Sequence, residues 1–243
     1  MKYVSLHDVN VYYNNKSILN SVNLEIRSDD FIGVIGPNGG GKTTLIKTIL
    51  KMTQYSGLVD YHKANLKIGY MPQIQQFDKT FPITLRDVVV SGLQSEKGLW
   101  KSYTKQDFKR ADALIEMTGI KHLINNAIGE LSGGEFQRVM LCRSIITNPE
   151  ILILDEPANF VDNKFEKELY ELLKALNEKM AIVMVSHDLG TIASYIKSFV
   201  CVNRSVHHHQ SNKITPEQLN YYDCPIQLIS HGEIPHIVLE KHK

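Results

Sequence analysis

The stretch Gly36-Pro37-Asn38-Gly39-Gly40-Gly41-Lys42-Thr43-Thr44 is the strongest indication of the fold class, because it contains the pattern G-x-x-x-x-G-K-[ST]. An apolar strand is expected before it at Phe31–Ile35, and a helix after it to about Lys51. Glycines let successive backbone N–H groups turn toward a phosphate, and the start of the following helix adds the positive end of its dipole. All nine residues of the stretch are therefore predicted to bind a nucleoside triphosphate.

A second apolar run, Ile151–Leu154, ends in the acids Asp155 and Glu156. In an α/β protein the carboxyl end of a buried parallel strand is where a site forms. We expect Lys42 to neutralise the β- and γ-phosphates, and Asp155 to hold Mg²⁺ through water near the Thr43 hydroxyl. Glu156 would polarise the attacking water. The chain has no N-K-x-D sequence, which argues against a GTPase.

The rest of the chain alternates between strand and helix patterns. A helical region is expected from Thr84 to Asn148, with a capping box at Thr104-x-x-Asp107 and a stop at Gly119. From Ile151 onward, strands alternate with helices, which predicts a parallel sheet flanked by helices. The helical region therefore reads as an insertion into an α/β core.

Composition excludes several classes of protein. Of 243 residues, 43% are hydrophobic and 22% charged, as in a folded globular domain. The net charge of +1 argues against free-standing nucleic-acid binding, so no nucleic-acid partner is expected. No apolar run approaches the roughly 18 residues of a membrane span, and the N-terminus has no apolar signal core. With three scattered cysteines, the chain reads as cytosolic.

The stretch Leu131-Ser132-Gly133-Gly134-Glu135-Phe136-Gln137-Arg138 resembles the LSGGQ signature of ATP-binding cassette (ABC) ATPases, with Glu135 in place of the commoner glutamine. The resemblance covers essentially the whole chain. It implies an α/β fold: a P-loop NTPase (RecA-like) core with an antiparallel β subdomain and an inserted α-helical signature subdomain. A single domain over 1–243 would comprise the core and β subdomain (1–72 and 149–203), the helical subdomain (73–148) and a His-rich C-terminal tail (204–243).

The resemblance also implies roles for residues outside these motifs. Tyr13 would stack on adenine, with neighbouring Tyr12 as the alternative. Gln73 resembles the glutamine that contacts Mg²⁺ and connects to the helical subdomain. His187 resembles the switch histidine near the γ-phosphate. Asp162 resembles the acidic residue of a loop that crosses the dimer. The implied catalytic set is Lys42, Gln73, Glu156 and His187, and the implied magnesium ligands are Thr43, Gln73 and Asp155.

The resemblance further implies a head-to-tail dimer with two ATP molecules. Each ATP, with Mg²⁺, would lie between Lys42 of one copy and Ser132, Gly133 and Gly134 of the other. ATP would favour the closed dimer, and hydrolysis would release it. The loop at Ala158–Asp162 departs from the family, since bulky Phe160 stands where small residues are common. Its geometry is therefore not fixed by the resemblance.

A single cassette without a membrane span resembles the ATP-hydrolysing subunit of an ABC importer. Its partners would be a second copy and integral membrane permease subunits, with an extracytoplasmic metal-binding protein acting indirectly. It would lie at the cytoplasmic face of the cell (inner) membrane, held there by the permease. The phosphate loop, the signature and the tail are most similar to the zinc/manganese/iron branch, which favours zinc uptake. Manganese or iron uptake, a non-metal transporter and a soluble non-transport ATPase are the alternatives.

Two segments leave a choice between a functional and a structural role. Gln75–Gly98 is where the family docks the permease, but Val88–Val90 also fit an ordinary helix core. The tail carries soft metal donors that could sense zinc. An exposed polar tail is the favoured interpretation, because the donors show no fixed zinc spacing; they are His207, His208, His209, His231 and His236, with Cys201 and Cys224.

Overall fold

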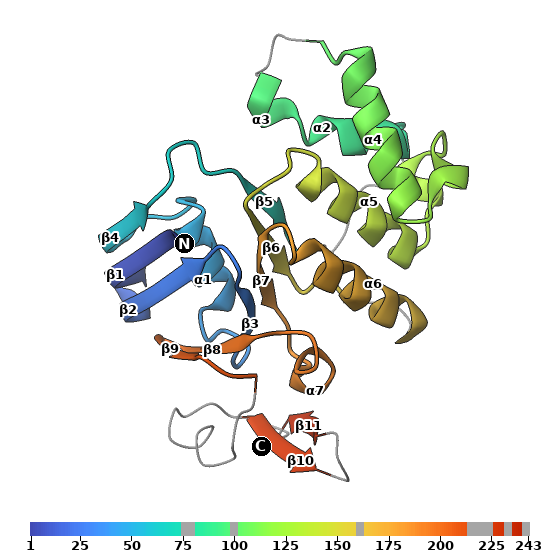
Figure 1. The fold of residues 1–243 in the computed structure, drawn as a ribbon. Helices are drawn as coiled ribbons and strands as arrows, with labels where there is room; N and C mark the ends of the chain where they lie inside the picture. The colour runs from blue at the N-terminus through green and yellow to red at the C-terminus, as the bar shows by residue number, and fades with distance from the viewer. Residues whose placement is uncertain (74–80, 98–101, 159–162, 213–225, 231–234, 240–243) are drawn as a thin grey trace.

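The computed structural model describes residues 1–73, 81–97, 102–158, 163–212, 226–230 and 235–239. Two sheets form its framework (Figure 1). The smaller sheet is antiparallel, in the order β2-β1-β4, and consists of β1 (Lys2–Tyr13), β2 (Lys16–Arg27) and β4 (Ser56–Tyr61). In β1, Leu6 and Val9 are both buried although they are three positions apart, an odd spacing for one face of a strand, because the pairing with β2 shifts its register between them.

The larger sheet has six strands in the order β5-β6-β7-β3-β8-β9. All neighbouring strands are parallel except the last pair. Three of its strands are buried throughout, as expected where both faces of a parallel sheet are covered. The strands are β3 (Phe31–Ile35), β5 (Ile68–Met71), β6 (Ile151–Asp155), β7 (Ala181–Val185), β8 (Ser198–Asn203) and β9 (Ser205–His209).

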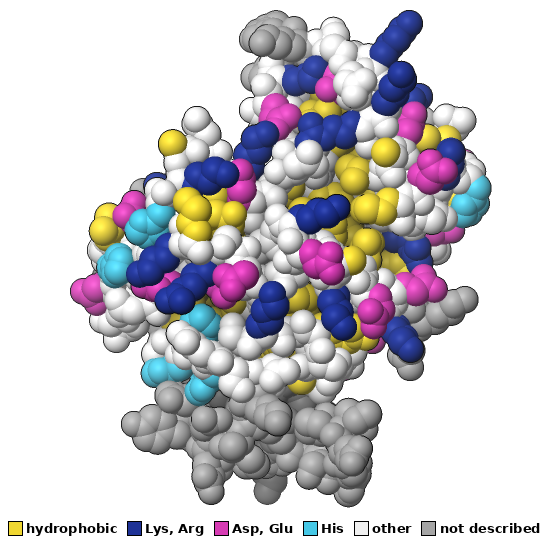
Figure 2. Space-filling model, in the orientation of Figure 1, with side chains coloured by type: hydrophobic (Ala, Val, Ile, Leu, Met, Phe, Trp, Pro, Cys, Tyr) yellow, Lys and Arg dark blue, Asp and Glu magenta, His cyan; other side chains and the backbone are white. Residues whose placement is uncertain are grey.

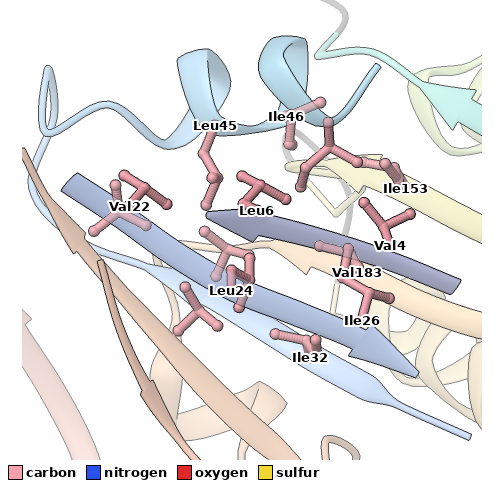
Figure 3. Packing of buried hydrophobic residues seen from close by; sticks show 14 of the residues in the cluster. Val4, Leu6, Val22, Leu24, Ile26, Ile32, Leu45, Ile46, Ile153 and Val183 are labelled. Atoms are coloured by element: carbon pink, nitrogen blue, oxygen red, sulfur yellow. The ribbon is translucent and has the colours of Figure 1, made fainter. Parts of the chain in front are cut away.

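Helix α1 (Lys42–Ile49) packs between the two sheets. Leu45 and Ile46 point from α1 into one apolar cluster with Leu6 and Leu24 of the small sheet and Ile153 of the large one (Figure 3). A second apolar cluster includes residues of α6 (Asn163–Leu176) and α7 (Leu189–Ile192) packed with residues of the large sheet. The large sheet is therefore the middle layer, which fixes the loops at its carboxyl edge.

The helical region lies between β5 and β6 in the chain, as predicted for an insertion. It contains α2 (Leu85–Ser91), α3 (Gln94–Lys97), α4 (Lys105–Met117), α5 (Gly133–Ile145) and the 3₁₀ turns η1 (Lys121–Leu123) and η2 (Ile128–Glu130). The predicted capping box is present at the start of α4, and Gly119 has a left-handed φ of 76° just after its end. The predicted α/β architecture with a β subdomain and inserted helices is confirmed.

Within the segment expected to meet a permease, Val88, Val89 and Val90 belong to the buried core of the helical region. The sequence allowed either a structural or a permease-docking role for these three valines, and their burial supports the structural role. Phe81 is 57% exposed at the start of the described part of this segment. Residues 74–80 and 98 lie outside the described residues. In the ranges that the structure describes, no helix is long and apolar enough to cross a membrane.

The start of the expected tail differs from the prediction of an exposed polar segment. His207–His209 form half-buried β9, which pairs with β8 and extends the large sheet beyond the expected core boundary at 203. The strand forms there because Val206 packs against the core and the His208 ring bonds Ser198 Oγ at 3.0 Å. In Figure 2 histidines gather at the lower left, and acidic and basic side chains are interspersed over the face shown.

The remaining soft donors do not complete a metal centre in the described part of the chain. Among the described residues, no group of three or more His, Cys, Asp or Glu side chains is placed to hold a metal ion. Cys201 is buried in β8. Cys224 and His231 lie outside the described residues. His236 is on β11 (Pro235–Leu239), which pairs with β10 (Ile226–Ser230) beside α7 (Figure 1).

Candidate nucleotide-binding and hydrolysis site

Four adjacent strands of the large sheet deliver the predicted residues to one edge. The phosphate loop follows β3, Gln73 follows β5, Asp155 ends β6 and His187 follows β7. These strands are parallel and neighbours in the order β5-β6-β7-β3, so their carboxyl ends meet. Residues far apart in the sequence are thereby gathered at one place.

The phosphate loop encloses a space lined by backbone atoms, and side chains on its glycines would fill that space. Gly36 and Gly41 have φ values of 147° and 108°, which disfavour any residue with a Cβ. A Cβ on Gly36 would lie 2.1 Å from the backbone oxygen of Val202. Helix α1 begins after Gly41 with no side-chain cap, so its first N–H groups are available to an anion. The loop fits a phosphate group.

Lys42 is buried at the start of α1, with 7% of its surface exposed. Its Nζ donates hydrogen bonds to the backbone oxygens of Gly36 at 2.8 Å and Pro37 at 3.0 Å. These bonds hold the ammonium over the loop. A buried cation beside the uncapped start of α1 is complementary to a polyphosphate.

Thr43 and Asp155 form the next pair. The Thr43 hydroxyl donates to Asp155 Oδ2 at 3.2 Å, across from the end of β6. Asp155 is 2% exposed, and this burial raises the pKa of its carboxyl, while the Thr43 hydrogen bond opposes the rise. Hydroxyl and carboxylate oxygens are the ligands that Mg²⁺ prefers. This donor set fits a magnesium ion.

Glu156 is held by both its backbone and its side chain. Its φ is +53°, a left-handed conformation uncommon for glutamate and often found at functional sites. The Glu156 N–H donates to the Val185 oxygen at 3.1 Å. Gln73 Nε2 donates to Glu156 Oε2 at 2.5 Å, so the structure brings these two predicted residues into contact.

His187 is exposed and lines a pocket of about 190 Å³ with Glu156, Ser186 and Asp188. The same pocket is lined by Glu166 and Tyr170 of α6, which the sequence analysis did not single out. The Tyr170 hydroxyl donates to Glu166 Oε1 at 3.1 Å, and burial raises the Tyr170 pKa. Tyr170 is almost completely buried on α6, and no motif in the sequence marks it as a residue of this pocket.

The signature stretch forms the start of α5. Ser132 is the N-cap, and its side chain and that of Glu135 form a capping box. Ser132 and Gly133 are exposed. A Cβ on Gly134 would lie 3.3 Å from Phe165 Cδ2, so α5 packs closely on α6 there. Figure 1 shows α5 well apart from α1, so a single copy does not bring the signature to the phosphate loop.

Tyr12 and Tyr13 end β1, and both are exposed, at 56% and 44%. The Tyr13 hydroxyl lies 2.9 Å from Thr53 Oγ1. Both rings are open to solvent, as a stacking surface requires, and exposure does not separate the two candidates. Asp162 and Phe160 lie outside the described residues, so the crossing loop stays a prediction from sequence.

Comparison with known proteins gives the same picture. The family model described as ABC transporter matches residues 19–159. A probable metal transport system ATP-binding protein of Thermotoga maritima is 36% identical over 97% of this chain and 98% of its own length. The zinc import ATP-binding protein ZnuC of Pasteurella multocida is 39% identical over 99% of this chain and 86% of its own length.

Among solved structures, a metal-chelate type ABC transporter in an inward-facing conformation matches with a TM-score of 0.85. The match covers 99% of this chain and 98% of that one. At 22% sequence identity, it supports the fold alone. The fold and the site define a P-loop ATPase. The chain belongs to the ABC transporter family, as an ATP-hydrolysing subunit. Cassettes of this family bind nucleotide, form dimers and work with membrane permease subunits.

Proposed function

We propose that this chain binds MgATP at Gly36–Thr44 and hydrolyses it to drive uptake of a divalent metal ion, with zinc as the ion transported. One observation carries the hydrolytic part. The phosphate cradle, the Thr43–Asp155 pair and the Gln73–Glu156 pair lie at the carboxyl ends of neighbouring strands. The metal follows from similarity over nearly the whole chain to relatives named for metal transport and zinc import.

In the proposed mechanism the loop residues hold the triphosphate. Gly36–Gly41 and the first turn of α1 bind it through backbone N–H groups, and Lys42 exchanges its bonds to the Gly36 and Pro37 oxygens for phosphate oxygens. Thr43, Asp155 and Gln73 would hold Mg²⁺. When bound, the metal neutralises charge that develops on the phosphate oxygens. Tyr13, rather than Tyr12, stacks on the adenine ring.

Glu156 is the general base that accepts a proton from the attacking water. Gln73 orients its carboxylate through the 2.5 Å hydrogen bond, and the Glu156 backbone is fixed by Val185. His187, which lines the same pocket as Glu156, donates a hydrogen bond to the γ-phosphate as charge develops. The three residues thus act on one water and one phosphorus centre.

The site is completed by a second copy. Ser132, Gly133 and Gly134 of one copy close on the ATP held by the other through the N-terminus of α5, with Asp162 in the loop that crosses the dimer. The separation of α5 from α1 within one copy supports this arrangement (Figure 1). ATP then favours the closed dimer, because its phosphates contact both copies.

The dimer would act beneath integral membrane permease subunits, at the cytoplasmic face of the inner membrane. An extracytoplasmic metal-binding protein would deliver the ion to the permease. Phe81, which is 57% exposed and precedes α2 in the chain, would contribute an apolar contact to the permease. No nucleic-acid partner is proposed.

The test is metal uptake by cells whose only copy of the gene encodes either the native protein or Glu156→Gln. Labelled Zn²⁺, Mn²⁺ and Fe²⁺ are offered separately at limiting concentration. We expect Glu156→Gln to abolish zinc uptake and to leave manganese and iron uptake unchanged. Loss of manganese or iron uptake instead would replace the ion and retain the mechanism. Unchanged uptake of all three would contradict the assignment to metal transport.

A further inference from the structure

The hydroxyl of Ser132 is already engaged within its own copy. Ser132 Oγ donates its single proton to Glu135 Oε2 at 2.7 Å, and it accepts the Glu135 N–H at 3.4 Å. The Ser132 N–H donates to the same carboxylate oxygen at 2.8 Å. Both donors that Ser132 can present to a ligand are therefore directed at Glu135.

The partner of Ser132 is a charged group. The backbone and side-chain hydrogen bonds from Ser132 hold the Glu135 pKa below its usual value, and the charges of His122 and Arg138 act in the same direction. Glu135 is thus ionised at neutral pH. A hydrogen bond to a carboxylate is roughly twice as strong as one to a neutral amide. A glutamine would keep the capping box and would hold Ser132 less tightly.

We propose that Glu135 is a positioning residue that raises the ATP concentration needed to close the dimer. This inference rests on the proposed function, in which Ser132 of one copy donates to the ATP held by the other. One hydroxyl proton cannot be donated to both acceptors, so closure must break the Ser132–Glu135 bond.

Glu130 provides a matched control for charge. It is exposed and lies two residues before Ser132, at the end of η2. The change Glu130→Gln removes the same charge from the same end of α5 and leaves the Ser132–Glu135 bonds in place. Comparison of the two substitutions separates the specific hydrogen bond from a general change in charge.

The experiment measures the ATP concentration that gives half-maximal dimer, by light scattering after size exclusion, in a Glu156→Gln parent that does not turn ATP over. We expect Glu135→Gln to lower this concentration about five- to tenfold, and Glu130→Gln to change it less than twofold. Glu135→Ala, a second neutral variant, should lower it as well. Thermal unfolding without ATP verifies that each variant is folded.

The outcomes separate this inference from the proposed function. If the parent forms no dimer with ATP, the proposed function fails, and the role of Glu135 fails with it. If the parent dimerises and Glu135→Gln requires as much ATP as the parent, only the role of Glu135 is contradicted. An equal decrease with Glu130→Gln would also overturn it, because the effect would then be one of charge alone.

Discussion

Asp155 is buried at the end of β6, where a charged carboxylate is costly unless a cation is present. Its hydrogen bond from Thr43 compensates only in part, since the net effect of its surroundings is to raise its pKa. Because the folded-state pKa is above the unfolded one, ionisation of Asp155 lowers the free energy of unfolding as pH rises. The ionised Asp155 carboxylate is thus suited to binding a metal ion, and it destabilises the folded protein when no metal ion is bound.

We predict that Asp155→Asn stabilises the nucleotide-free protein at pH 7 by about 1 kcal/mol and weakens magnesium-dependent ATP binding. The amide oxygen can still accept the Thr43 hydrogen bond, but no charge is buried. The gain in stability should shrink as pH falls through the folded-state pKa of Asp155, because the native carboxyl then becomes neutral. Urea unfolding at several pH values, with and without MgATP, measures both effects. A variant less stable than the native protein at pH 7 would contradict this reasoning.

At the scale of elements, the start of α5 is positioned by α6. The Phe165 ring packs against Gly134, and the Arg138 guanidinium lies over the same ring at 4.8 Å from its centroid. Arg138 also bonds the Thr118 oxygen and Glu168 at 2.5 Å each. Phe165 and Arg138 therefore hold the start of the signature helix against α6, while Leu141 and Ile145 pack its later turns into the core.

We predict that Phe165→Ala destabilises the protein by about 3 kcal/mol, because it leaves a cavity between α5 and α6. The matched control is Phe81→Ala, whose ring is 57% exposed and whose loss should cost less than about 0.5 kcal/mol. Chemical denaturation of the two variants measures the difference. Equal costs would show that Phe165 does not fix α5 to the core.

Elements were predictable from the sequence where local signals are strong. The glycine pattern, the capping box at Thr104 and the apolar strand before Asp155 each rest on neighbouring residues. The histidine strand β9 was missed, because polar residues form a strand there only through pairing with β8. Tyr170 was missed as a pocket residue for a similar reason: its contact with Glu166 is local, but the rest of the pocket is formed by the segments that follow β6 and β7.

On the scale of the whole molecule, sheet order creates the site. Gln73 and Glu156 meet because β5 and β6 are neighbours, and that pairing could not be derived from spacing in the sequence. The resemblance to ABC ATPases supplied the candidate residues, and the fold explains why most of them share one edge. The signature stands apart in the helical region, which makes the second copy part of the proposed site (Figure 1).

The most direct test of the account measures ATP turnover and ATP-dependent dimerisation together, in the native protein, Glu156→Gln and the exposed control Glu178→Gln. Removal of a general base should lower turnover by at least about 100-fold, while Glu156→Gln still dimerises with ATP. Glu178→Gln should match the native protein in both. Native turnover by Glu156→Gln would contradict the central claim that this carboxylate, at the end of β6, activates the water that cleaves ATP.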